Sequence, residues 1–162
     1  MSTVDISFPC PGWQARHEAI AEAAERAARA VLDDRGAGED HADYEISIVM
    51  ADDAFIRELN RNWRNIDKPT NVLSFPADDA DDHGPRMLGD VVLAHETIAR
   101  EALASGTPML DHVTHLIIHG TLHLLGFDHE SEQEAGEMEA LESRLLARLG
   151  IADPHAITPE RP

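Results

Sequence analysis

A cluster of histidines in the last third of the chain constrains how the backbone around it can fold. Five of the ten histidines fall between residues 112 and 129, and the string from His119 to His129 reads HGTLHLLGFDH. His119 and His123 are four residues apart, so on a helix their imidazoles project from one face, one turn apart. Gly126 can take a positive φ, which ends a helix and turns the chain back toward the histidine pair. The string therefore predicts a helix, a tight turn and an approach of His129 to the same point.

Three imidazoles at one point are a ligand set for zinc. Zn–N bonds are about 2.0–2.1 Å long, and three neutral imidazoles leave a fourth position for water, as in catalytic zinc sites. We expect one Zn²⁺ per chain, bound by His119, His123 and His129, with the zinc-bound water as a reactive group. Cys10 is the only cysteine. A single cysteine excludes a disulfide within the chain and any zinc site that needs two thiolates from this chain.

Three further residues in this region are candidates for the pocket. The spacing matches the metal-binding string of metzincin proteases, but those proteases place a general-base glutamate where this chain has Gly120. A glycine costs a helix about 1 kcal/mol relative to alanine, which predicts that another chain segment or the substrate approaches closely there. His115 lies one turn before His119 and is a candidate to support a ligand or to line the pocket. Asp128 is a candidate to orient a ligand.

Hydrophobic periodicity predicts the fold class. We expect an α/β domain of the α+β type: a small mixed four-stranded sheet covered by about five helices, with the zinc site at the end of a central helix. We expect Asp52, Thr107 and Ser131 to cap the helices that follow them. The expected strands are residues 3–8, 44–50, 71–75 and 88–94, and the expected helices are residues 13–34, 53–63, 95–104, 108–125 and 131–149.

The chain length of 162 residues fits one domain. We expect a single metal-dependent hydrolase domain over residues 1–150 and a flexible tail over residues 151–162. No window approaches 18 apolar residues, and the N-terminus has no basic segment followed by an apolar one. The expectation is a cytoplasmic protein with no membrane partner.

The second informative stretch runs from Leu59 to Pro76 and reads LNRNWRNIDKPTNVLSFP. Arg64 stands at the expected end of a helix, before a turn and a strand. A guanidinium held there can bind a phosphate in bidentate fashion. Arg61 and Lys68 are possible further contacts to a phosphate-bearing ligand, although an ordinary solvated helix face is the favoured interpretation of Arg61.

These motifs together resemble one known family. WRNIDKPTNVLSFP, LGDVVLA and HGTLHLLGFDH occur in this order within residues 44–150 and are similar to those of the YbeY family of bacterial endoribonucleases, which are rRNA maturation factors. The resemblance implies that His119, His123 and His129 bind zinc and that Arg64 is the functional arginine. It also implies metal-dependent cleavage of single-stranded RNA, with roles in small-subunit rRNA 3′-end processing and ribosome quality control. The implied partner is ribosomal RNA, on the ribosome or with ribosome-associated proteins.

Two other interpretations stay open at this point. One is a metallopeptidase-like hydrolase, which the histidine spacing favours and Gly120 disfavours. The other is a non-catalytic zinc-containing ribosome-associated factor. The residues also leave the nucleophile open between zinc-bound hydroxide and the 2′-OH of RNA.

The formal net charge of −18, from 13 basic and 31 acidic residues, argues against a general nucleic-acid coat. The acids are concentrated, however, with four in residues 78–82 and seven in residues 128–142. Screening over about 8 Å at physiological salt lets a positive pocket coexist with a negative exterior. We therefore expect weak, local binding of RNA.

Overall fold

The computed structural model describes residues 2–36, 43–77, 86–128, 130–152 and 154. Within these ranges it contains four strands and five α-helices, which confirms the expected mixed α/β fold class. The strands are Thr3–Ser7 (β1), Tyr44–Ala51 (β2), Val72–Pro76 (β3) and Arg86–Ala94 (β4). The helices are a 3-10 helix Pro11–Arg16 (η1), His17–Gly36 (α1), Asp53–Arg64 (α2), His95–Ser105 (α3), Met109–Leu124 (α4) and Glu132–Arg148 (α5).

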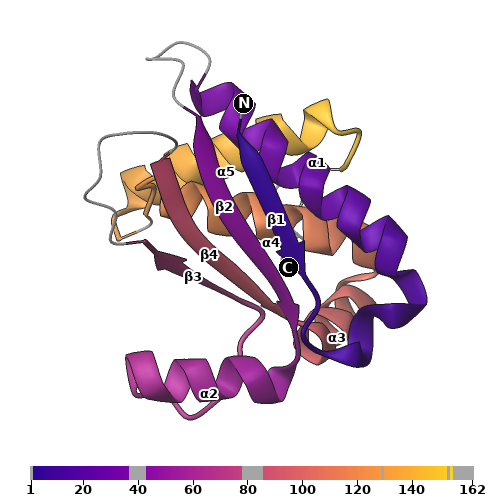
Figure 1. Cartoon of the computed structure of the whole chain (residues 1–162). Coiled ribbons are helices and arrows are strands. Elements are labelled where there is room, and N and C mark those ends of the chain that lie inside the picture. The colour runs from indigo at the N-terminus through magenta and orange to yellow at the C-terminus, as the bar shows by residue number, and fades with distance from the viewer. Residues whose placement is uncertain (1, 37–42, 78–85, 129, 153, 155–162) are drawn as a thin grey trace, which may run out of the picture.

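The sheet has the order β1-β2-β4-β3, as Figure 1 shows. β1, β2 and β4 run parallel, whereas β3 pairs antiparallel with β4. Gly89 in β4 has a φ of +135°, and a Cβ added there would lie 2.2 Å from the carbonyl oxygen of Phe75. Only glycine permits this close approach. It lets β3 lie tightly against β4, which fixes the strand beside the histidines.

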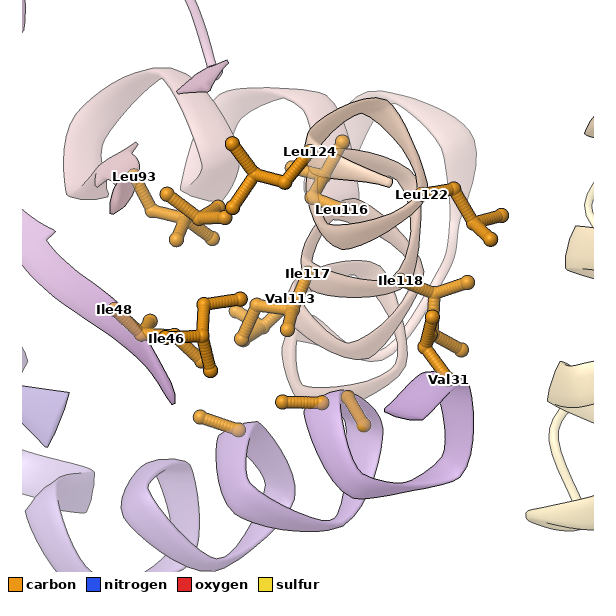
Figure 2. Packing of buried hydrophobic residues seen from close by; sticks show 14 of the residues in the cluster. Val31, Ile46, Ile48, Leu93, Val113, Leu116, Ile117, Ile118, Leu122 and Leu124 are labelled. Carbon is orange, nitrogen blue, oxygen red and sulfur yellow. The ribbon is translucent and has the colours of Figure 1, made fainter. Parts of the chain in front are cut away.

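The larger core lies between one face of the sheet and the helices α1 and α4. Alternate residues of the strands point to this face, because side chains alternate along a strand. Ile46, Ile48 and Leu93 of the sheet face the side chains of α4, among them Val113 and Ile117 (Figure 2). α4 is buried on most of its circumference. The prediction of a central helix is therefore confirmed.

The opposite face of the sheet carries a smaller core under α2. Ile56 of α2 packs there with Leu73 of β3 and Val92 and Ala94 of β4. Asn65 ends α2 in the left-handed conformation, with a φ of 60°, and its N–H donates to the carbonyl of Arg61. The C-terminal end of α2 is thereby fixed immediately before the segment that leads into β3.

Two of the three predicted helix caps are confirmed. The Asp52 side chain accepts from the Phe55 N–H at 2.9 Å, and Ser131 Oγ accepts from the Glu134 N–H at 3.1 Å. The prediction for Thr107 is wrong. α4 begins at Met109 because Pro108 is extended, with a φ of −58° and a ψ of 141°, and takes the cap position itself.

Some predicted segments fall outside the described residues. These are residues 78–85 of an acidic loop expected over residues 78–86, whose last residue instead begins β4, and most of the expected tail over residues 151–162; Ile151 itself packs against the larger core. Among the helices that the structure describes, none combines the length and the apolar character needed to cross a bilayer.

Candidate metal centre

The last two turns of α4 place His119 and His123 side by side. Their Nε2 atoms lie 3.1 Å apart, and their ring planes are nearly perpendicular, at 83°. Both side chains are half-buried. The i, i+4 spacing of the sequence therefore brings the two imidazoles to one point, as predicted.

The other ring nitrogens of this pair are held by acceptors. His119 Nδ1 donates to Glu142 Oε2 at 2.7 Å, and His123 Nδ1 donates to the carbonyl oxygen of Phe127 at 2.9 Å. A carboxylate and a carbonyl only accept, so each Nδ1 carries the proton. In a neutral imidazole the proton on Nδ1 leaves a lone pair on Nε2. Both rings, when neutral, therefore present lone pairs toward each other.

This geometry fits a metal ion of the zinc type. Two such lone pairs at 3.1 Å repel unless a proton or a metal cation lies between them. Two nitrogens on a tetrahedral zinc ion, each about 2.0–2.1 Å from it, lie about 3.3 Å apart. Ligating histidines also usually donate their second N–H to a carboxylate or a carbonyl, as both do here. Among the described residues no set of three His, Cys, Asp or Glu side chains is arranged around one ion, and His129, the expected third ligand, lies outside them.

The chain turn after α4 contributes directly to this arrangement. Gly126 has a φ of +101°, and the Phe127 N–H returns to the carbonyl of Leu122 at 3.0 Å, which closes the helix end. The same turn directs the Phe127 carbonyl at His123 Nδ1. The glycine predicted to turn the chain thus also orients a histidine.

Glu142 of α5 is a site residue that the sequence reasoning missed. Its side chain is 2% exposed, and its two oxygens accept from His119 Nδ1 and from His115 Nε2, the latter at 2.9 Å. His115 therefore reaches the pair through Glu142 and supports the carboxylate. A signal was present in the sequence, because Glu142 interrupts the apolar stripe of α5, and glutamate is rarely buried without a partner.

We expect Glu142→Gln to weaken zinc binding by about 10- to 100-fold, because an amide is a poorer acceptor for the His119 N–H than a carboxylate. The variant keeps the size of the side chain and should fold. Zinc affinity is measured by competition with a chromophoric chelator. Glu137→Gln, on the exposed face of α5 and outside the pocket that His119 and Glu142 line, is the matched control and should bind zinc as wild type does. Equal affinities for the two variants would remove Glu142 from the site.

The close approach expected at Gly120 comes from the sheet. A Cβ at this position would lie 2.7 Å from Val91 Cγ1 and 3.0 Å from Ser74 Oγ. Ser74 Oγ also donates to the Gly120 carbonyl at 2.9 Å. The glycine lets α4 lie directly against β3 and β4, so this side of the helix faces the protein interior.

A cavity of about 730 Å³ joins the histidine pair to the second sequence motif. Arg64 lines it together with His119, His123 and Asp128. Nη1 of Arg64 donates to Asn60 Oδ1 at 3.2 Å, and the buried Asn60 donates from Nδ2 to the Lys68 carbonyl at 2.9 Å. The packing thus brings Arg64, at the end of α2, into the same cavity as the end of α4.

Arg61 and Lys68 are placed elsewhere. Arg61 lines a separate depression of about 280 Å³ with Arg57 and Glu58. Within the part of the chain that the structure describes, neither Arg61 nor Lys68 lines the histidine cavity. Arg57 donates from Nε to Asp67 Oδ1 at 2.8 Å, and this hydrogen bond holds the pKa of the Asp67 carboxyl below its ordinary value. Arg64 is therefore the basic side chain of this motif that shares the cavity with the histidines.

The mixed sheet and this cavity define a small α+β protein whose candidate hydrolytic site contains an imidazole pair and an arginine. The family model described as Endoribonuclease YbeY matches residues 13–150, and the chain belongs to this family. This chain is 52% identical over 152 residues to an Endoribonuclease YbeY of Nitrobacter hamburgensis. The aligned region covers 91% of this chain and 77% of that protein. This chain is 51% identical over 160 residues to the Azorhizobium caulinodans protein of the same name, which covers 97% of this chain and 98% of that one.

A solved structure agrees in fold. The solution structure of TM1509 from Thermotoga maritima superimposes with a TM-score of 0.53, over 98% of this chain and 99% of that one, at 20% identity. This similarity extends over the whole mixed sheet and its helices, and it concerns the fold alone.

Proposed function

We propose that this protein is a zinc-dependent endoribonuclease that cuts single-stranded RNA and acts in the maturation of ribosomal RNA. The observation that carries the proposal is the shared cavity of His119, His123 and Arg64, in which two imidazole lone pairs and a guanidinium face one volume. The relatives that cover most of this chain are named as endoribonucleases. A metal ion and a fixed cation together suit a phosphodiester, because both stabilise the negative charge that develops on its oxygens.

The residues divide the chemistry between them. His119, His123 and the unplaced His129 would hold the ion, and Glu142 fixes the His119 ring. The chemistry that zinc supplies when bound is Lewis-acid polarisation of a phosphoryl oxygen. Arg64, which lines the same cavity, binds a phosphate oxygen and stabilises negative charge as it develops. Asn60 positions Arg64 through the hydrogen bond at 3.2 Å.

A peptidase of the metzincin type is disfavoured by the same geometry. Its general base would follow His119, but Gly120 occupies that position and faces Val91 and Ser74 of the sheet. Glu142 is buried behind the ring of His119, where its oxygens bind two histidines. Neither position supplies a base to the cavity.

The net charge supports a ribosomal RNA substrate that is presented to the site. A chain with a net charge of −18 binds long RNA poorly through general electrostatics. The RNA is therefore presented locally, by the ribosome or by ribosome-associated proteins in the cytoplasm, and a role in ribosome quality control fits the same presentation. A purely structural zinc ion is the contrasting hypothesis.

The test compares substrates and metal states of the purified protein. We expect the zinc-loaded protein to cut labelled single-stranded RNA, to leave a generic peptide intact, and to lose RNA cleavage by at least about a hundredfold after chelation. Restoring zinc should restore cleavage. Circular dichroism follows the fold throughout. Peptide cleavage without RNA cleavage, or unfolding on chelation with no RNA cut in any state, would contradict the proposal.

A further inference from the structure

A tryptophan lies exposed on the rim of the candidate site. The Trp63 side chain is 72% exposed, although tryptophan is among the most buried residue types on average. It precedes Arg64 at the end of α2 and lines the same cavity as His119 and His123. An exposed indole beside a phosphate-binding arginine requires an explanation, because its apolar surface is costly to leave in water.

On its other side Trp63 borders an apolar groove of about 530 Å³. Phe55 and Leu59 of α2 form one wall of this groove, and Phe75 and Pro76 of β3 form another. Trp63, Phe75 and Pro76 line both this groove and the histidine cavity. The groove is thus continuous with the candidate site, and its volume falls within the range of about 300–1,000 Å³ found for small-ligand pockets.

We propose that Trp63 and this groove form a binding site for one unpaired nucleobase, next to the phosphate held by Arg64. The inference rests on the proposed function, since it places the RNA chain in the cavity. A nucleotide whose phosphate lies at Arg64 has its base within reach of the neighbouring indole, and aromatic side chains are the usual stacking surface for single-stranded bases. Asp90, which also lines the groove, can accept a hydrogen bond from the amino group of adenine.

This site gives a physical reason for a preference for single strands. A base in a duplex is stacked on both faces and paired, so it cannot lie against Trp63 without leaving the helix. The low aromatic content of 4% excludes a broad stacking platform but not a site for one base. Stacking at one position also suits a chain that binds RNA weakly and locally.

The two tryptophans of the chain allow a direct optical test. Trp13 is 2% exposed and donates Nε1–H to the Ala51 carbonyl at 2.8 Å, so a bound base cannot stack on it. We expect a single-stranded oligoadenylate to quench the fluorescence of the wild type in the presence of a chelator, where no cleavage occurs. Trp63→Phe, which retains only Trp13, should show no quenching. The same oligoadenylate paired with oligouridylate should not quench the wild type.

Binding and kinetics complete the test. Trp63→Ala should raise the Kd for labelled oligoadenylate, measured by anisotropy, by roughly 5- to 150-fold. Trp63→Phe should stay within about threefold of wild type, because phenylalanine retains a stacking face. In cleavage assays Trp63→Ala should raise KM with little change in kcat, since stacking is equal in the bound substrate and the transition state. Leu103→Ala, at an 85% exposed position of α3, is the control and should match wild type.

The outcomes separate this inference from the proposed function. A wild type that cuts RNA with zinc, combined with unchanged Kd and KM in Trp63→Ala, would overturn the base site and leave the function intact. Quenching and a raised Kd in a protein that never cuts RNA would retain the base site and overturn the function. Equal quenching by the duplex would also overturn the base site.

Discussion

His123→Ala is expected to lose zinc and RNA cleavage together. The variant removes one of the three imidazoles that would hold the ion, and the two that remain, His119 and His129, are too few for a stable zinc site. Metal catalysis contributes several kcal/mol to transition-state stabilisation, so cleavage should fall by about a thousandfold or more. Zinc content is measured by mass spectrometry. Cleavage of a defined single-stranded RNA is measured on the same preparation.

A matched control lies on the same helix. His112 of α4 bonds Glu101 through Nε2 at 2.8 Å and does not line the histidine cavity. His112→Ala should therefore keep zinc and cleavage, while it passes through the same purification. Full RNA cleavage by zinc-free His123→Ala, in a preparation free of other nucleases, would show a metal-independent mechanism and would sink the proposed site.

Arg64→Glu is expected to separate zinc binding from catalysis. Arg64 is exposed and interacts with Asn60, so the substitution should change the free energy of unfolding by about 0.5 kcal/mol at most. It leaves the histidine pair and Glu142 in place, so zinc should remain. Loss of the guanidinium removes stabilisation of the charged transition state, and kcat/KM should fall by about 10²- to 10³-fold. The readouts are zinc content, thermal unfolding and RNA cleavage.

The charge reversal itself needs a control, because the chain is already strongly acidic. Arg26→Glu makes the same change in net charge at an exposed position of α1 that does not line the cavity. Its cleavage should stay near the wild-type rate. Arg64→Lys keeps the charge but loses the planar fork of donors. Its cleavage rate should therefore lie between those of Arg64→Glu and Arg26→Glu. Normal cleavage by Arg64→Glu would show that this arginine has no role in the reaction.

The local parts of the site were predictable because their geometry is set by sequence spacing. Residues four apart on a helix share a face, so His119 and His123 had to converge once that segment was helical. The glycine at 126 allowed the turn, and the glycine at 120 indicated a close approach. Asp52 and Ser131 were recognisable as caps because capping depends on a neighbour three residues away.

Other features depend on contacts between elements far apart in sequence. Glu142 reaches His119 across 23 residues, and only the packing of α5 beside α4 brings them together. Thr107 was a plausible cap by residue type, but the extended Pro108 moved the helix start beyond its reach. The exposure of Trp63 could not be predicted either, because it depends on where β3 and α2 leave a groove.

The sequence by itself determined the fold class, the histidine pair and the arginine candidate, since helix periodicity and turn chemistry operate over a few residues. The tertiary structure alone decided that Arg64 shares a cavity with His119 and His123, whereas Arg61 and Lys68 do not line it. It also decided that a buried carboxylate holds the proton on His119 Nδ1. The physical reason is that both depend on how α2, α4 and α5 pack around the sheet, through side-chain fit and hydrogen bonds across long separations in the chain.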